Sequence, residues 1–289
     1  MSRMTLAHLA LFSALPLAAC ASASQEEKIQ EEFHNVEAHY GATLGVYAVD
    51  TGSGRTVEYR PDERFAYAST MKALAAGALI DGAGAEGLHR EVAVTAEEIV
   101  PYSPVLENHV GENVTLMEAA KAAVVHSDNT AGNKIFEALG GPEGLQRALR
   151  DRGDAATVSC RNEPGLNEAV ADQECDTTTP RAVTENLRAY LVDGILNEDE
   201  RDLLQGWMEE SATGMNLIRA GLPEGWKAGD KSGMGLRFGA RGDTAIIFPP
   251  NGAPIVMTVY ARKDDVDSHT EDAAIADSAA VAVSALRGE

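Results

Sequence analysis

The segment Ser69-Thr-Met-Lys-Ala-Leu-Ala-Ala-Gly-Ala-Leu-Ile80 begins with a hydroxyl and an amine and continues as an apolar, alanine-rich run. The pattern over 71–80 predicts a helix that begins next to Ser69. Side chains three residues apart lie on one face of a helix, so Lys72 can reach Ser69. The N–H groups and positive potential of a helix N-terminus favour negative charge that develops near Ser69 during acyl transfer. Ser69 and Lys72 are therefore candidate catalytic residues.

This helix opens a predominantly helical middle section, and strand patterns lie on both sides of it. Helical spacing predicts further helices at 116–125, 131–139, 142–150, 180–191 and 198–209. Strand-like runs lie outside this section at 43–49, 56–59, 244–248 and 254–260, and an amphipathic helix at 273–286 closes the chain. Strands at both ends predict a sheet built from both termini, with the helical region inserted as a second domain.

The N-terminal residues have the layout of a secretory signal, because Arg3 precedes the apolar run 6–17. The run ends in Leu17-Ala-Ala-Cys20, which resembles a bacterial lipobox, in which the Cys is lipidated and becomes the mature N-terminus. Cleavage after Ala21-Ser-Ala23 is the alternative and would leave a soluble secreted protein. Either way the protein is expected outside the cytosol, in the periplasm or at the cell surface. Residues 21–31 are then expected to be a polar tether, with helical spacing over 25–39.

Composition limits the choice of partners. With 289 residues, 44% of them apolar, the chain can bury a sizeable core. Its formal charge of −21 disfavours nucleic acid and anionic lipid surfaces as partners. No other segment is long and apolar enough to span a membrane, so membrane attachment is expected only through a lipid on Cys20. We expect a monomer.

Two further motifs suit chemistry at a serine. Ser127-Asp-Asn129 stands at the head of a predicted helix, where a helix N-cap is the simpler explanation. Lys231-Ser-Gly233 precedes the last strands, which places a cation and a hydroxyl on an edge strand, although a turn with a surface lysine would have the same spelling. Each of the three motifs is weak alone. Ser-x-x-Lys, for example, occurs about once by chance in a chain of average composition.

Three other signals do not indicate function. The spelling Gly82-Ala-Gly-Ala-Glu-Gly87 matches a dinucleotide fingerprint but follows a helix instead of a strand. The tripeptide Arg241-Gly-Asp243 has the spelling of an integrin-binding motif, but it begins a predicted core strand, so the match is a coincidence. The seven histidines are scattered and give no zinc ligand set, so neither a metal nor another cofactor is predicted.

Taken together and in this order, the three motifs resemble the Ser-x-x-Lys, Ser-Asp-Asn and Lys-Thr/Ser-Gly set of penicillin-recognising serine enzymes. The segment Arg161-Asn-Glu-Pro-Gly-Leu-Asn167 closely resembles the Ω-loop of class A β-lactamases, whose Glu and Asn position the deacylating water. The resemblance extends from Glu31 to Leu286 and includes the segment that begins at Tyr102. The chain is therefore identified as a member of the class A serine β-lactamases.

The resemblance implies an α/β fold of the α+β type. It consists of a five-stranded antiparallel sheet flanked by helices plus an all-helical domain, with the active site in the cleft between them. We assign residues 1–20 to the signal peptide, 32–66 and 211–289 to the α/β domain, and 67–210 to the all-helical domain. The Ω-loop occupies 160–176 within the latter.

The same resemblance implies a role for each motif residue in opening a β-lactam ring. Ser69 would attack the carbonyl while the N–H groups of Ser69 and Met234 bind the oxyanion. Lys72, or Glu163 through water, would take the Ser69 proton, and Glu163 would activate the deacylating water. Ser127 would deliver a proton to the lactam nitrogen. Asn129 and Asn167 would hold the substrate amide and the water. Lys231 and Ser232 would bind the substrate carboxylate, and Tyr102 would be a further substrate contact.

The sequence departs from the family at the rim of the site. A small residue often follows the Lys-Thr/Ser-Gly motif in the family, whereas this chain has Met234, followed by Gly235 and Leu236. The position of the arginine that often supports the carboxylate site holds Ala240 by counting from Lys231, which leaves Arg237 and Arg241 as alternatives.

Once Cys20 is set apart, Cys160 and Cys175 form an even pair in a compartment that permits disulfides. They stand next to Arg161 and Asp176, which resemble the neck salt bridge of the family Ω-loop. We therefore predict a disulfide across that neck.

Two other functions remain open from the sequence. A penicillin-binding peptidase would not need Glu163 and Asn167. A β-lactam sensor would be acylated without turnover, yet every expected catalytic side chain is present here.

Overall fold

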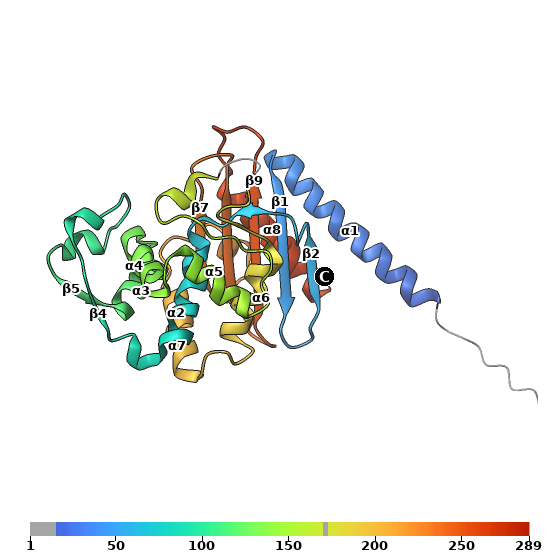
Figure 1. The fold of residues 1–289 in the computed structure, drawn as a ribbon. Helices are drawn as coiled ribbons and strands as arrows, with labels where there is room; N and C mark the ends of the chain where they lie inside the picture. Colours follow the sequence, from blue (N-terminus) through green and yellow to red (C-terminus); the bar gives the residue numbers. More distant parts are fainter. Residues whose placement is uncertain (1–15, 170–172, 289) are drawn as a thin grey trace, which may run out of the picture.

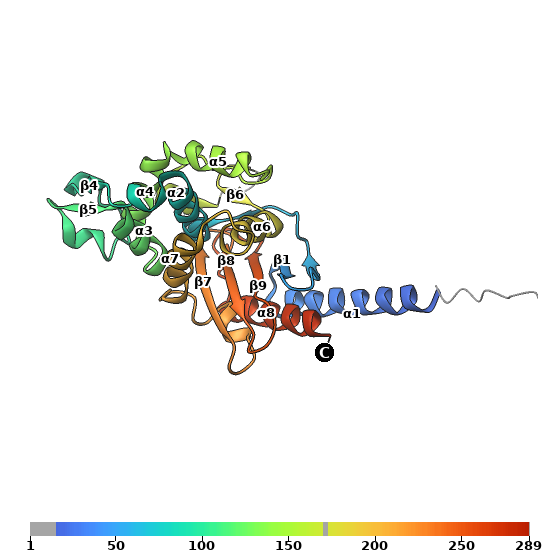
Figure 2. The same ribbon diagram turned by 90° about the horizontal axis from the view of Figure 1, so that it is seen from below.

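A five-stranded antiparallel sheet forms the centre of the computed structural model, which describes residues 16–169 and 173–288 (Figures 1 and 2). The strand order is β2-β1-β9-β8-β7. The strands are β1 (Thr43–Asp50), β2 (Thr56–Tyr59), β7 (Lys227–Met234), β8 (Arg241–Phe248) and β9 (Ile255–Arg262). Strands from the two ends of the chain meet where β1 pairs with β9. The predicted fold class is thereby confirmed, and β7 is the edge strand that the third motif required.

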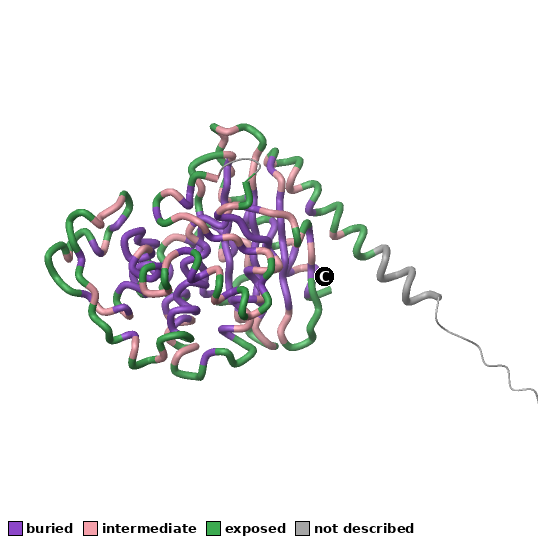
Figure 3. Tube along the Cα trace, viewed as in Figure 1, coloured by how far each residue is buried: buried purple, intermediate pink, exposed green. Residues whose placement is uncertain are grey.

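Helices α1 (Pro16–Tyr40) and α8 (Asp272–Arg287) cover one face of the sheet (Figure 2). Residues 21–31, expected as a polar tether, lie within α1, and the helical spacing predicted over 25–39 agrees with this helix. Glu, Gln, Lys and Ala are good helix formers, so a polar composition does not exclude a helix. Most of α1 after residue 24 is exposed (Figure 3). Phe33 is fully buried and fixes the helix to the core, with Ile29 and Val36 packed beside it.

The other face of the sheet carries the helical region (Figures 1 and 2). Its helices are α2 (Met71–Gly87), α3 (Leu116–Val125), α4 (Asn129–Leu139), α5 (Pro142–Asp151), α6 (Pro180–Leu191) and α7 (Glu198–Glu209). Every residue of α2 from Met71 to Ile80 is buried, as expected for a helix that is apolar on all sides. All six helices were predicted. The Gly-rich segment 82–87 forms the end of α2, where Gly84 interrupts the helical conformation. The tripeptide that begins at Arg241 is buried in β8.

Several short elements have no recognisable sequence pattern. Strand β3 (Phe65–Ala66) pairs with β6 (Thr177–Thr178), and β4 (Glu91–Ala93) pairs with β5 (Asn113–Thr115). The 3-10 turns are η1 (Ala68–Thr70), η2 (Ala96–Glu98), η3 (Leu106–His109), η4 (Gly165–Glu168) and η5 (Ile218–Gly221). Two to four residues are too few to establish a periodicity.

The signal segment 1–15 lies outside the described residues, and the lipidation of Cys20 stays a prediction. The domain boundaries at residues 67 and 211 stay a prediction. Among the residues that the structure describes, none of the helices combines the length and apolar character that crossing a membrane requires.

Candidate active site

The candidate nucleophile lies in a tight turn between strand β3 and helix α2. Ser69 is the middle residue of η1. Ala68 before it has φ 44°, a left-handed conformation that residues other than glycine rarely adopt. Strand β7 packs closely on the turn, because a Cβ on Gly233 would lie 2.9 Å from the Tyr67 carbonyl oxygen. A glycine at this position therefore lets the edge strand approach the turn of Ser69.

Lys72, one helical turn after Ser69, brings four oxygens together. Its Nζ donates to Ser69 Oγ at 3.0 Å, to Ser127 O at 2.8 Å and to Asn129 Oδ1 at 2.6 Å. It also lies 2.9 Å from Glu163 Oε1. Burial lowers the pKa of Lys72, and the charge of Glu163 opposes that effect. The predicted residues of three separate segments thus meet at one amine.

Lys231 is a second buried lysine on the opposite side of Ser127. Its Nζ donates to Ser127 Oγ at 3.1 Å and to Ser232 O at 2.9 Å. Burial and the nearby positive charge of Lys72 lower the pKa of Lys231 to about 7. Ser127 therefore contacts both lysines, one through its carbonyl oxygen and one through its hydroxyl.

The turn at Ser127 is held by its neighbour Asp128, as the helix-cap explanation required. Asp128 Oδ1 accepts from Ala131 N at 2.8 Å and so caps α4. Its Oδ2 accepts the N–H groups of Val105 and Leu106. The capping role and a catalytic role for Ser127 are therefore compatible.

The Ω-loop places Glu163 against Lys72. The main chain of Glu163 is held on both sides by Asn133, which accepts from Glu163 N at 2.8 Å and donates to Glu163 O at 3.0 Å. Asn167 Nδ2 donates to Glu163 Oε2. Among the described residues, Asn167 Oδ1 is buried without a hydrogen-bond partner. A buried acceptor beside a carboxylate is a suitable site for an ordered water.

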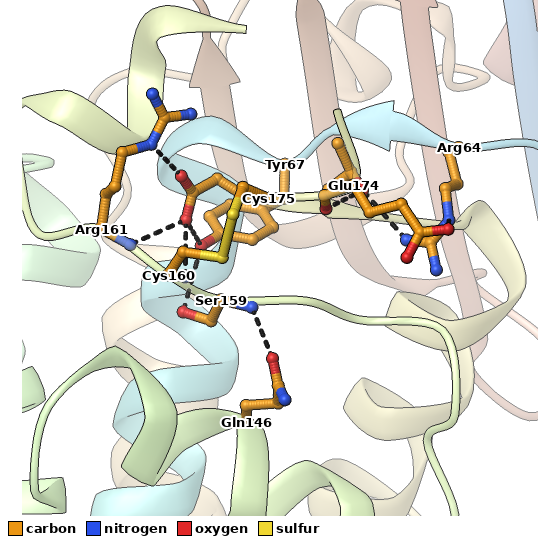
Figure 4. The surroundings of a disulfide bond; sticks show 10 residues. Arg64, Tyr67, Gln146, Ser159, Cys160, Arg161, Glu174 and Cys175 are labelled. Atoms are coloured by element: carbon orange, nitrogen blue, oxygen red, sulfur yellow. Dashed lines mark hydrogen bonds and ion pairs between the residues drawn. A yellow bond between two sulfur atoms is a disulfide. The ribbon is translucent and has the colours of Figure 1, made fainter. Parts of the chain in front are cut away.

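The neck of the Ω-loop is closed covalently and by charge (Figure 4). Cys160 and Cys175 form a disulfide with a Cα–Cα distance of 5.6 Å, which confirms the predicted pairing. Asp176 is buried beside it, and its carboxylate accepts from Arg161 Nε at 2.5 Å and from the N–H groups of Cys160 and Arg161. The two ends of the loop are therefore joined by one covalent bond and several hydrogen bonds.

The end of the site next to Ser232 has a buried arginine. Ser232 Oγ donates to Thr213 Oγ1 at 2.8 Å. Arg241 stands opposite Met234 in the β7–β8 register and donates from Nη1 to Gly233 O at 2.9 Å. Its Nε binds Asp272 at 2.8 Å, whereas Arg237 is exposed. Of the two alternatives, Arg241 lies next to the Lys231-Ser-Gly233 motif.

The rim of the site is apolar and exposed. The side chains of Tyr102, Met234 and Leu236 are 61%, 61% and 68% exposed. Tyr102 O accepts from Asn129 N at 2.9 Å, and Leu236 N donates to Asn167 O at 2.7 Å. Both rim segments are therefore hydrogen-bonded to residues of the site itself.

The structure brings together Ser69, Lys72, Ser127, Asn129, Glu163, Asn167, Lys231 and Ser232, and it places Tyr102 and Met234 at the rim. Sequence reasoning did not find Asn133, Thr213 or Tyr67. These residues belong to no motif, and only their tertiary contacts indicate a role.

Comparison with known proteins gives a consistent result. A sequence model described as "Beta-lactamase enzyme family" matches residues 26–286. The β-lactamase of Amycolatopsis lactamdurans is 45% identical over 92% of this chain and 88% of its own length, and β-lactamase 1 of Bacillus cereus is 46% identical over 90% and 84%. The class A β-lactamase of Clostridium kluyveri DSM 555 has a TM-score of 0.88 at 39% identity, covering 90% of this chain and 99% of that one. A halotolerant bacterial β-lactamase has a TM-score of 0.86 at 40% identity, covering 89% and 98%.

Proposed function

The chain belongs to the class A serine β-lactamases, and from this premise we propose that Ser69 opens the lactam ring and Glu163 releases the acyl-enzyme. The observation that carries the assignment is the position of Lys72 Nζ, 3.0 Å from Ser69 Oγ and 2.9 Å from Glu163 Oε1. One amine thereby links the nucleophile of the first step to the base of the second.

In acylation, Ser69 Oγ attacks the lactam carbonyl carbon and its proton passes to the Lys72–Glu163 pair. The N–H groups of Ser69 and Met234 bind the oxyanion that develops on the carbonyl oxygen. When the C–N bond breaks, the lactam nitrogen takes a proton from Ser127 Oγ. Ser127 is reprotonated by the proton that left Ser69, so the Lys72–Glu163 pair returns to its starting state. The contact of that hydroxyl with Lys231 Nζ, at 3.1 Å, supports this delivery.

In deacylation, a water bound between Glu163 and Asn167 attacks the ester carbonyl. Glu163 takes the water proton. As the ester C–O bond breaks, a proton returns from Glu163 through Lys72 Nζ to the Ser69 oxygen, which leaves as the hydroxyl. Asn167 Oδ1, buried and without a partner among the described residues, supports the binding of this water. Asn133 fixes the main chain of Glu163, so the carboxylate is held ready for the step.

The substrate carboxylate is proposed to bind at Lys231 and Ser232, with Arg241 behind them. A bound carboxylate favours the charged form of Lys231, which burial disfavours in the free enzyme. Asn129 contacts the substrate amide, and Tyr102 and Met234 line its apolar parts. We further propose that the protein acts as a monomer, is exported, and is lipid-anchored through Cys20.

The proposed roles are tested by intact-protein mass spectrometry after brief exposure to a penicillin. Glu163→Ala should be acylated and should retain the adduct, because base catalysis of this kind contributes roughly 10²- to 10⁴-fold. Ser69→Ala should form no adduct. Turnover by Glu163→Ala at the wild-type rate would mean that another residue is the deacylating base. A wild-type adduct that is never released would indicate a sensor or peptidase instead of a hydrolase.

A further inference from the structure

Tyr67 is a fully buried tyrosine that lies between the Ω-loop neck and the turn of Ser69. Its hydroxyl donates to Asp176 Oδ1 at 2.8 Å and lies 3.1 Å from Ser159 Oγ. Figure 4 shows its ring reaching from the β3–α2 segment to the disulfide, beside Ser159, Cys160 and Arg161. The side chain thus joins the neck to a different part of the chain.

The main chain of Tyr67 is equally well held. Its N–H donates to Asp176 O at 3.3 Å, and its carbonyl oxygen accepts from Thr70 N at 3.1 Å and from Thr70 Oγ1 at 2.6 Å. Asp176 therefore binds Tyr67 through both its side chain and its main chain. On the other side, Tyr67 O closes the turn that contains Ser69.

Ala68, between Tyr67 and Ser69, has the strained φ of 44°. A conformation of this kind costs energy and persists only where the surroundings hold it in place. The contacts of Tyr67 provide that constraint from the N-terminal side, and α2 provides it from the other. Loss of an anchor at Tyr67 would release strain one residue away from the nucleophile.

The phenol is suited to a permanent anchor. Burial raises its pKa well above 10, and the charge of Asp176 acts in the same direction. The hydroxyl therefore stays protonated and, having one hydrogen, donates it to the carboxylate. A hydrogen bond from a buried donor to a charged acceptor is among the stronger kinds in proteins.

We propose that Tyr67 is a positioning residue that couples the Ω-loop neck to the nucleophile turn and so sets Ser69 Oγ relative to Lys72 and Glu163. The inference rests on the proposed function, since it assigns Tyr67 to the acylation step at Ser69. The role differs from that of Asn133, which holds Glu163 directly from α4.

Tyr67→Phe tests the proposal because it removes only the hydroxyl. Single-turnover acylation is measured over a range of penicillin concentrations by rapid quenching and mass spectrometry. It gives separately the acylation rate constant and the dissociation constant of the noncovalent enzyme–penicillin complex. We expect the acylation rate constant, counted only over the protein that becomes acylated, to fall about tenfold, since small displacements of reacting groups slow a reaction strongly. The dissociation constant should not change, because Tyr67 is buried away from the substrate.

Ser159→Ala is the matched control. It removes the other hydroxyl in contact with the phenol and leaves the bond to Asp176 in place, so its acylation rate constant should stay close to wild type. Tyr67→Met also lacks the hydroxyl while filling the pocket with a flexible side chain. It should reproduce the loss even if Tyr67→Phe folds poorly.

The disulfide provides a second readout. The phenol and the Cys160–Cys175 bond hold the same neck, so Tyr67→Phe should slow acylation more in a Cys160→Ala/Cys175→Ala background than in wild type. Equal acylation rate constants for wild type and both Tyr67 variants would overturn the proposal, as would an equal loss in Ser159→Ala. Absence of any adduct on wild-type Ser69 would instead refute the proposed function.

Discussion

Removal of the Cys160–Cys175 disulfide measures what a covalent bond adds to a loop neck that hydrogen bonds already close. The cysteines are 15 residues apart, and constraining a loop of this size contributes roughly 3 kcal/mol in the chain-entropy model. This figure is an upper limit, because the Arg161–Asp176 ion pair restrains the same neck. For a domain of this size, 3 kcal/mol corresponds to a decrease in Tm of about 6–12 °C. We therefore expect Cys160→Ala/Cys175→Ala to unfold several degrees below wild type.

Thermal unfolding of wild type and the double variant, each with and without a reductant, provides the measurement. Reductant should lower the Tm of wild type towards that of the double variant and should leave the double variant unchanged, which controls for effects of the reagent. Alkylation and peptide mapping of the unreduced wild type should find no free thiol at Cys160 or Cys175. The same Tm for both proteins, or two alkylated thiols at these positions, would refute the reasoning.

Three further predictions concern single residues. Asn133→Ala removes both hydrogen bonds that fix the main chain of Glu163, so deacylation should slow by about 10- to 100-fold while acylation changes less; an adduct that does not accumulate would contradict this. Since the pKa of Lys231 in the free enzyme is lowered to about 7, the lysine loses its charge as the pH rises through 7, and kcat/KM for a carboxylate-bearing penicillin should decline on that side. Lys231→Arg, which stays charged, should lack this alkaline decline, and an identical pH profile for both proteins would refute the assignment. Mass spectrometry of the mature N-terminus should find a lipid on Cys20, and an unmodified chain that begins at Ser24 would exclude the anchor.

The long elements were predictable because each repeats a pattern over several turns or strand residues. Helices α3, α6 and α7 begin and end where the sequence placed them, and the five strands pair as a sheet from both termini. The start of α1 was less predictable, because the sequence before residue 25 has no helical spacing. Polarity indicates exposure but does not exclude a helix, and a helix that packs on the core through Phe33, Ile29 and Val36 can be exposed over most of its surface.

The grouping of the candidate catalytic side chains was predictable because motif spacing fixes some of them locally, as for Ser69 and Lys72 on one helical face. The arginine near the carboxylate site was not, since its place depends on how many residues the β7–β8 connection contains. Counting from Lys231 led to Ala240, which is buried and has an uncharged side chain. The strand register instead pairs Met234 with Arg241, and pairing determines which side chain reaches the motif.

The residues that hold the catalytic groups in place are the hardest to find from sequence, because their partners are distant in the chain. Asn133 binds Glu163 across 30 residues, and Tyr67 binds Asp176 across 109. Neither has a motif spelling, and each would be taken from sequence alone as an ordinary helix or core residue. Yet the position of Glu163 relative to Ser69 depends on both, since one fixes the Ω-loop to α4 and the other fixes its neck to the nucleophile turn. Substitutions that leave every motif residue intact should therefore still separate acylation from deacylation, with Tyr67 acting mainly on the first step and Asn133 on the second.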